Sequence, residues 1–201
     1  IFQENKVADA YIGRGTAYLY LKDTVRALEN FDQAIRTNRE NPNGYYQRGT
    51  LLLQKEEYAR AEADFDMSIR CDSAFLPPYF NRAVFYSNTN RPMQALADFD
   101  RVLQLDSTNS FTYFNRAILR TQIGDYNRAL DDFDRVALYS PGNVQVYYLR
   151  AMLKTRLGDL EGAERDYTRA IELYPDFANA YIYRGRLREL LRDPQGAKED
   201  R

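Results

Sequence analysis

The sequence predicts an all-α protein built as a solenoid of antiparallel helix hairpins. Three series of residues predict this fold, because each recurs with a step of 34 residues along the chain of 201. Recurrence at one fixed period of this length is the signature of a repeat architecture. The small residues of the first series are Gly15, Gly49, Ala83, Ala117, Ala151 and Gly185. The second series consists of Ala27, Ala61, Ala95, Ala129, Ala163 and Ala197, and the third of Tyr11, Tyr45, Tyr79, Tyr113, Tyr147 and Tyr181.

Both halves of each repeat are predicted to be helices. In the clearest copy, Tyr113, Ala117 and Arg120 lie at i, i+4 and i+7, which places them on one face of a helix. Ala129 and Phe133 form the matching face of the next helix. The small residues let the two backbones approach, and the ring on each helix fills the space beside the small residue of the other. The two helices are therefore expected to pack as a pair.

Turn and end signals separate the predicted helices. Gly124 suits a left-handed C-terminal cap, and Asp125 directly after it suits the N-cap of the following helix. Pro92 falls at the first position of a second helix, where the missing N–H costs nothing. Pro141 follows a second helix and is a further stop signal. Each repeat is therefore predicted to be a helix, a tight turn and a helix.

These columns resemble the tetratricopeptide repeat family, whose unit is a helix–turn–helix of 34 residues. The resemblance implies a right-handed superhelical solenoid of about six hairpins that forms a single domain over residues 1–201. Residues 1–7 are expected to be the tail of a preceding unit, and the last unit stops inside its second helix. Both ends therefore look cut from a longer array. The expected units are 8–41, 42–75, 76–109, 110–143, 144–177 and 178–201.

Two charged columns accompany the packing residues and predict a ladder of ion pairs. An arginine precedes each small residue, and an aspartate follows each repeat alanine by three positions, except that the first repeat has Asn30. Because the counter-charge is supplied in phase, we interpret the arginines as structural partners of aspartates in their own or a neighbouring unit. The competing interpretation is a stripe for phosphate or carboxylate ligands. The central pairs of this ion-pair ladder are Arg48 with Asp64, Arg82 with Asp98, Arg116 with Asp132, and Arg150 with Asp166.

The family resemblance places a further set of side chains on the concave groove of the superhelix. Asparagines at the positions of Asn81 and Asn115 hold the ligand backbone in family members that bind extended peptides, which makes this set the candidate partner-binding site. The competing interpretation is that the rings pack on adjacent helices and the amides meet only water. The rings are Tyr46, Phe80, Phe114 and Tyr148, and the other candidates are Gln47, Asn81, Asn115, Thr50, Val84 and Ile118.

The composition excludes several classes of site. The chain contains no histidine and a single cysteine, Cys71, which removes the commonest general base and metal ligand and rules out an intrachain disulfide. A formal net charge of −1 argues against a basic nucleic-acid surface. No apolar run approaches the roughly 20 residues of a membrane span. The sequence therefore predicts no catalytic residue, no metal, no cofactor, no nucleic-acid ligand and no membrane span.

The sequence thus predicts a non-enzymatic protein–protein interaction scaffold whose concave groove binds a peptide or a helix of a partner. An alternative function is a regulatory or substrate-presenting array attached to a catalytic domain outside this segment. Self-association through the ends of the array is a further prediction, because an end without a polar capping helix exposes an apolar face.

Overall fold

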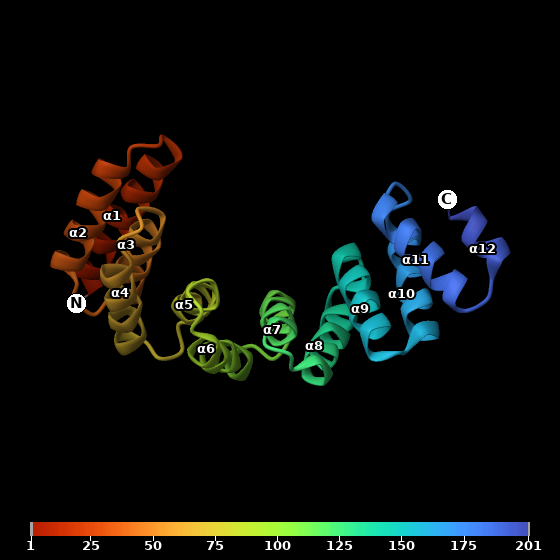
Figure 1. Ribbon diagram of the computed structural model, residues 1–201. Coiled ribbons are helices and arrows are strands. Elements are labelled where there is room, and N and C mark those ends of the chain that lie inside the picture. Colours follow the sequence, from red (N-terminus) through yellow and green to blue (C-terminus); the bar gives the residue numbers. More distant parts are fainter. Residues whose placement is uncertain (1, 201) are drawn as a thin grey trace. The chain divides into compact units, whose positions relative to one another are not determined.

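The described part of the protein is entirely helical. The structure is a computed structural model that describes residues 2–200, and these residues form twelve helices and no strand (Figure 1). Consecutive helices pair as hairpins, which confirms the predicted solenoid of antiparallel helix pairs. By their contacts the residues form two compact units, which part between Leu105 and Asp106.

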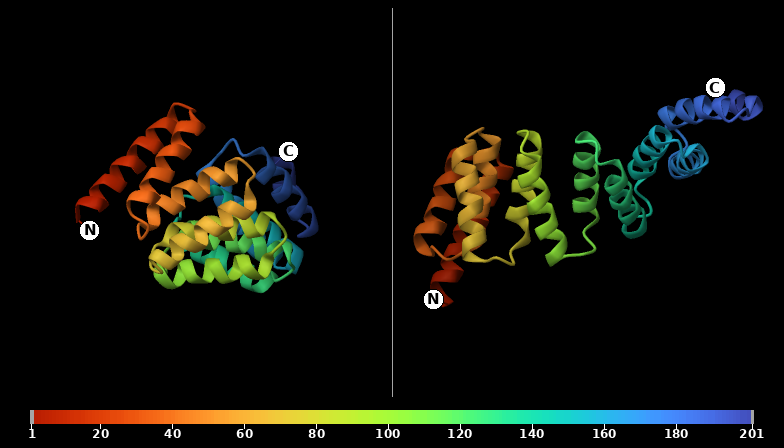
Figure 2. Two further views of the ribbon diagram at one scale, coloured as in Figure 1. Left: turned by 90° about the vertical axis from the view of Figure 1, so that its left-hand side faces the viewer. Right: turned by 60° about the horizontal axis from the view of Figure 1, so that its bottom comes forward.

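The first unit contains three hairpins, in which α1 packs against α2, α3 against α4, and α5 against α6. In Figures 1 and 2 the two helices of a pair lie side by side and run in opposite directions. The helices of this unit are α1 (Phe2–Tyr20), α2 (Thr24–Thr37), α3 (Pro42–Gln54), α4 (Tyr58–Cys71), α5 (Leu76–Asn88) and α6 (Pro92–Leu105).

The second unit repeats this arrangement, with α7 against α8, α9 against α10, and α11 against α12. Its last helix is the shortest, with 6 residues. The helices of this unit are α7 (Ser110–Gln122), α8 (Tyr126–Tyr139), α9 (Val144–Leu157), α10 (Leu160–Leu173), α11 (Ala178–Leu190) and α12 (Pro194–Glu199).

The start of α1 differs from the sequence prediction. Residues 1–7 were expected to end a preceding unit, yet α1 begins at Phe2 and continues without a break to Tyr20, while Ile1 lies outside the described residues. Figure 2 shows the N-terminal end of α1 extending beyond its neighbours. Residues 2–7 carry no glycine or proline that would stop the helix, so they lengthen the first helix of the first hairpin.

The core of each hairpin consists of the predicted small residues and rings. A Cβ added to Gly15 on α1 would lie 2.6 Å from the ring of Phe31 on α2, so only a residue without a side chain allows this approach. Burying one such ring stabilises the fold by roughly 1.5–3 kcal/mol relative to leaving it exposed. The second-helix rings are almost completely buried, namely Phe31, Phe65, Phe99, Phe133 and Tyr167.

All six hairpin turns contain a residue in the left-handed conformation at the same place in the repeat. Glycine was expected there from the sequence, and Gly158 indeed forms a left-handed C-cap with φ 86°. The following Asp159 caps the next helix by accepting a hydrogen bond from the backbone N–H of Gly162. The residues with positive φ at this position are Lys22, Glu56, Asn90, Gly124, Gly158 and Arg192.

Candidate functional site

The first helices of neighbouring hairpins enclose a cavity at the same place in each unit. In the first unit, α3 and α5 border a cavity of about 430 Å³, and in the second unit, α7 and α9 border one of about 230 Å³. Most of the lining residues match each other when shifted by two repeat lengths, whereas Phe133 lines only the second cavity. On α3 these are Thr50, Leu53 and Gln54, and on α7 they are Ile118, Thr121 and Gln122.

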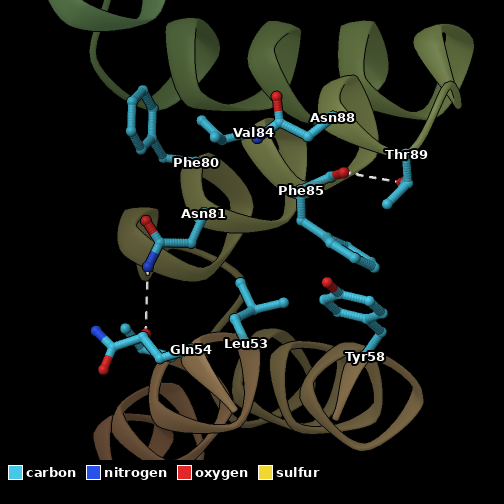
Figure 3. Close-up of a pocket in the computed structure, with 10 residues that line it drawn as sticks. Leu53, Gln54, Tyr58, Phe80, Asn81, Val84, Phe85, Asn88 and Thr89 are labelled. Atoms are coloured by element: carbon cyan, nitrogen blue, oxygen red, sulfur yellow. Dashed lines mark hydrogen bonds between the residues drawn. The ribbon is translucent and has the colours of Figure 1, made fainter. Parts of the chain in front are cut away.

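The α3–α5 cavity combines rings with uncharged polar groups. Figure 3 shows Phe85 and Tyr58 facing each other at one end, with Asn81 and Gln54 at the other. The centroids of the Tyr58 and Phe85 rings lie 5.5 Å apart. No charged side chain of the described residues lines this cavity, so it suits a ligand group that is neutral.

A chain of hydrogen bonds fixes the amide of Asn81 on the floor of this cavity. The hydroxyl of Thr50 donates its one proton to the carbonyl of Tyr46 at 2.9 Å, so towards Asn81 it can only accept. The Nδ2 of Asn81 therefore donates to Thr50 Oγ1, at 3.2 Å, and it also lies 3.4 Å from the Tyr46 hydroxyl. This orientation leaves Oδ1 of Asn81 as an acceptor that points away from α3 (Figure 3).

Two further amides at the rim of the cavity make no hydrogen bond. Within residues 2–200, the side chains of Gln54 and Asn88 have no protein partner, and both are exposed. Each amide can donate and accept at the same time, as a peptide group does. The rim can therefore hydrogen-bond to a peptide backbone without selecting its sequence.

The α7–α9 cavity is more apolar than its counterpart. Leu149 stands where the α3–α5 cavity has Asn81, and Ile118 stands where it has Thr50. The buried ring of Phe133 lines this cavity. Arg156 is one of the lining residues, and its guanidinium lies 4.5 Å from the centroid of the Tyr126 ring.

The predicted rings of the first helices pack against the core ring of their own hairpin. Phe80 lies 6.1 Å from Phe99 in an edge-to-face arrangement, and Tyr148, which is buried, lies 6.0 Å from Tyr167. Such pairs are favourable because the positive edge of one ring meets the negative face of the other. The same pairing joins Tyr46 to Phe65 at 6.4 Å and Phe114 to Phe133 at 6.2 Å.

The sequence-predicted binding residues divide between the cavities and other places. Two of the predicted amides bond locally instead: Asn115 donates to the carbonyl of Phe111 at 2.8 Å, and Gln47 donates to Oδ1 of Asn43 at 3.3 Å. The lining includes Thr50, Phe80, Asn81, Val84 and Ile118, but not Tyr46, Gln47, Phe114, Asn115 or Tyr148.

The arginine and aspartate columns meet as bidentate pairs inside every hairpin after the first, in which Asn30 takes the place of the aspartate. In Arg48 and Asp64, Nε and Nη2 lie 2.8 and 2.7 Å from the two carboxylate oxygens. Hydrogen bonding to Asp64 raises the pKa of the Arg48 guanidinium, so it stays charged despite partial burial. Equivalent two-bond contacts join Arg82 to Asp98, Arg116 to Asp132, Arg150 to Asp166, and Arg184 to Asp200.

The same arginines also reach the second helix of the preceding hairpin within a unit. Nη1 of Arg48 on α3 lies 2.8 Å from Asp32 on α2, and Nη1 of Arg150 on α9 lies 2.7 Å from Asp134 on α8. One guanidinium therefore joins three helices, because its planar fork presents several donors in a fixed geometry. These donors are used within the protein, which leaves the cavities as the candidate site.

Sequence profiles of the tetratricopeptide repeat match residues 12–74 and residues 144–177. The chain belongs to the tetratricopeptide repeat family. Repeats of this family mediate contacts between proteins, and the family fold is in general a scaffold without catalytic activity. As a tetratricopeptide repeat protein, this chain is therefore a protein-interaction module.

Solved structures of tetratricopeptide repeat proteins have the same fold. A Cytophaga hutchinsonii repeat protein has a TM-score of 0.83 at 17% identity, with 96% of this chain and 80% of that chain covered. Pseudomonas aeruginosa PilF has a TM-score of 0.81 at 17% identity, with 98% and 90% covered. YrrB, described as having an unusual peptide-binding site, has a TM-score of 0.71 at 23% identity, with 89% and 92% covered. No curated protein sequence gave a significant match.

Sequence reasoning about this tetratricopeptide repeat protein missed several cavity residues. Tyr58, Phe85 and Asn88 line the α3–α5 cavity, and Arg156 lines the α7–α9 cavity, although none was predicted. A signal was present, since Asn88 follows Val84 by one helical turn on the same face. The repeat shift that relates Asn88 to Arg156 would then have identified the second residue.

Residues 2–200 contain no group of three or more cysteine or acidic side chains that could hold a metal ion. None of the described helices is both long and apolar enough to cross a membrane.

Proposed function

We propose that this tetratricopeptide repeat protein binds an extended segment of a partner protein on the face formed by its first helices. The observation that carries the proposal is the pair of cavities at equivalent repeat positions, between α3 and α5 and between α7 and α9. Within a unit, the cavity would receive one side chain of a bound segment. The repeated position supports a binding role, because each unit offers such a cavity separately.

The free amides favour an extended segment over a helix. A helix satisfies its own backbone N–H and C=O groups, so it would leave Gln54, Asn88 and Oδ1 of Asn81 without partners. An extended segment presents unpaired backbone groups to the same amides. The fixed acceptor on Asn81 would take a backbone N–H, and the two rim amides would adapt to the next peptide groups.

Affinity would come from apolar side chains inserted into the cavities. Complete burial of a side chain of valine to phenylalanine size contributes roughly 1.5–3 kcal/mol. Part of this gain offsets the ordering of the flexible segment. A charged side chain placed in the lining would remove the gain and repel the incoming apolar group, which gives a direct test.

The test begins with peptides selected from a random peptide library on the wild-type protein, followed by affinity measurement with purified variants. Val84→Asp changes the α3–α5 cavity, and Met152→Asp changes the α7–α9 cavity. The matched controls Val25→Asp on α2 and Met93→Asp on α6 carry the same changes at exposed positions outside both cavities. Melting curves establish that each variant is folded.

We expect each cavity variant to weaken the peptides that use its cavity by about tenfold or more, the equivalent of about 1.4 kcal/mol or more. The control variants should bind as the wild-type protein does. Selected peptides that bind both cavity variants with unchanged affinity would place the binding face elsewhere and overturn the proposal. The same conclusion would follow if no peptide could be selected at all.

A further inference from the structure

The two cavities occupy equivalent positions but differ in chemistry. Hydroxyl and amide groups line the α3–α5 cavity, among them Thr50 and Asn81. The α7–α9 cavity also contains Thr121 and Gln122, but most of its lining is apolar and includes Ile118, Leu149 and Met152. A mostly apolar cavity offers few hydrogen bonds to a buried polar group, so it favours an apolar one. The α7–α9 cavity therefore has a selectivity of its own.

Its volume fits one apolar side chain of substantial size. The cavity measures about 230 Å³, whereas an engineered protein cavity of about 150 Å³ is large enough to hold benzene. A leucine or methionine side chain can therefore enter. Unbranched and γ-branched chains also suit the flexible Met152 in its wall, because methionine adapts its shape to a neighbour.

Arg156 adds a positive charge at the edge of this apolar cavity. The side chain is exposed, and no acidic group of residues 2–200 forms an ion pair with it. Its guanidinium is positioned by the Tyr126 ring, at 4.5 Å from the ring centroid. This differs from Arg150 on the same helix, whose guanidinium is held by Asp134 and Asp166. Arg156 is therefore available to a carboxylate of a ligand.

We propose that the α7–α9 cavity selects a segment in which a leucine or methionine stands next to a glutamate or aspartate. The apolar side chain enters the cavity, and the neighbouring side-chain carboxylate pairs with Arg156. This selectivity rests on the proposed function, since it specifies which extended segment the first-helix face binds.

The carboxylate is assigned to a side chain within the segment and not to its C-terminus. A nest of free backbone N–H groups is a recurring way to capture a terminal carboxylate. The residues that line this cavity lie within α7, α8 and α9, where backbone N–H groups are engaged in helical hydrogen bonds. A single guanidinium at the edge is the positive group of this lining, and it can pair with an acidic side chain beside the inserted one.

The test uses three sets of synthetic peptides and the full chain. In the first set, a central leucine or methionine stands next to glutamate, and both peptide ends are blocked to remove their charges. The second set has glutamine in place of glutamate. The third set has glutamine and a free C-terminal carboxylate. Affinities are measured by fluorescence polarisation at low and at high salt.

We expect the glutamate set to bind about two- to fivefold more tightly than the glutamine set, as an exposed ion pair would produce. High salt should reduce this preference, because it screens exposed charges. Arg156→Gln should abolish the preference, so that the glutamate and glutamine sets bind this variant with equal affinity. The control Arg135→Gln removes an exposed arginine of α8 outside the cavity and should retain the preference.

The outcomes separate this inference from the proposed function. Loss of the glutamate preference in Arg156→Gln alone would support the inference. Equal binding of the glutamate and glutamine sets to the wild-type protein would overturn it and leave the proposed function intact. A glutamate preference that survives in Arg156→Gln would also overturn the inference. Tight binding of the third set alone would overturn it as well. If none of the peptides binds and the library also yields no ligand, both proposals fail.

Discussion

Arg116 binds both carboxylate oxygens of Asp132, with Nε 2.9 Å from Oδ2 and Nη2 2.6 Å from Oδ1. Nη1 of Arg120 reaches Oδ2 of the same carboxylate at 2.7 Å. The Asp132 side chain is only 3% exposed, so protein cations replace the water that would otherwise solvate it. Since a buried charge without a partner is costly, the packing of α7 on α8 is coupled to this contact.

Replacing one aspartate of the ladder should destabilise the protein strongly. Asp98→Ala leaves Arg82 without its two-bond partner, and losing one member of a buried pair costs roughly 3–5 kcal/mol. Urea denaturation followed by circular dichroism would measure this loss. The control Asp131→Ala removes an exposed carboxylate and should change the stability by less than about 0.5 kcal/mol. Equal losses in the two variants would contradict a structural role of the pair.

Replacing both members of the same pair should cost less than replacing one. Arg82→Met combined with Asp98→Leu removes both charges and fills the space with apolar groups, so no buried charge remains unpaired. We expect this double variant to unfold at a higher urea concentration than Asp98→Ala. A double variant that is less stable than Asp98→Ala would indicate that the ion pair stabilises the fold more than apolar packing at the same two positions does.

The first rung of the ladder should be the weakest. Nε of Arg14 donates to Oδ1 of Asn30 at 2.6 Å, but the amide carries no charge and Arg14 is exposed. Asn30→Ala removes this hydrogen bond and the one that Nδ2 of Asn30 donates to the carbonyl of Arg26, without leaving a buried charge, at a cost of about 1–2 kcal/mol. The same denaturation measurement would show this. A loss as large as that in Asp98→Ala would mean that charge pairing is not what distinguishes the rungs.

A glycine should stabilise a turn that lacks one. Glu56 has a φ of 61°, a left-handed conformation that is unfavourable for a residue with a Cβ. Glu56→Gly should raise the free energy of unfolding by about 0.5–1 kcal/mol. The control Ala63→Gly on the exposed side of α4 should lower it by about 1 kcal/mol, because glycine weakens a helix interior. Thermal melting of both variants would reveal the opposite signs.

Alkaline pH should destabilise the second unit through Tyr167. Burial raises the pKa of Tyr167 from 10.0 to about 12. Because the folded pKa lies above the unfolded one, this contribution to stability is complete below a pH of about 10 and is lost as the pH rises towards about 12. Tyr167→Phe should flatten the fall in unfolding free energy over this range. Tyr174→Phe, at a half-exposed ring, should leave the fall unchanged.

The fold could be predicted because every repeat carries the same packing information. Ala117 and Phe133, for example, are buried as their helical spacing indicates, and the copies in other repeats have the same environment. The partner of Arg48 was harder to predict, because its own hairpin and the preceding hairpin both contain an aspartate at a suitable position. The guanidinium contacts both Asp64 and Asp32, which spacing along a single helix pair does not reveal.

The candidate site was harder to predict, because a cavity depends on what neighbouring side chains leave unfilled. Phe114 and Tyr148 were predicted to bind a partner because they are aromatic residues of the groove. Their rings instead contact Phe133 and Tyr167 of the hairpin core. The repeat shift from Asn88 leads to Arg156, but the sequence does not show whether its guanidinium has an acidic partner. Its exposure beside Met152 at the edge of an apolar cavity emerges only when α7 and α9 are placed side by side.

The sequence by itself determined the repeat, the helix pairs and the residues that pack them, since a recurring face of small and aromatic residues can be buried only against its partner helix. The tertiary structure alone decided which groups remain free for a ligand. Thr50 on α3 orients the amide of Asn81 on α5. The ring of Tyr126 on α8 positions the guanidinium of Arg156 on α9. Contacts between hairpins set these properties, and the period of the sequence carries no information about them.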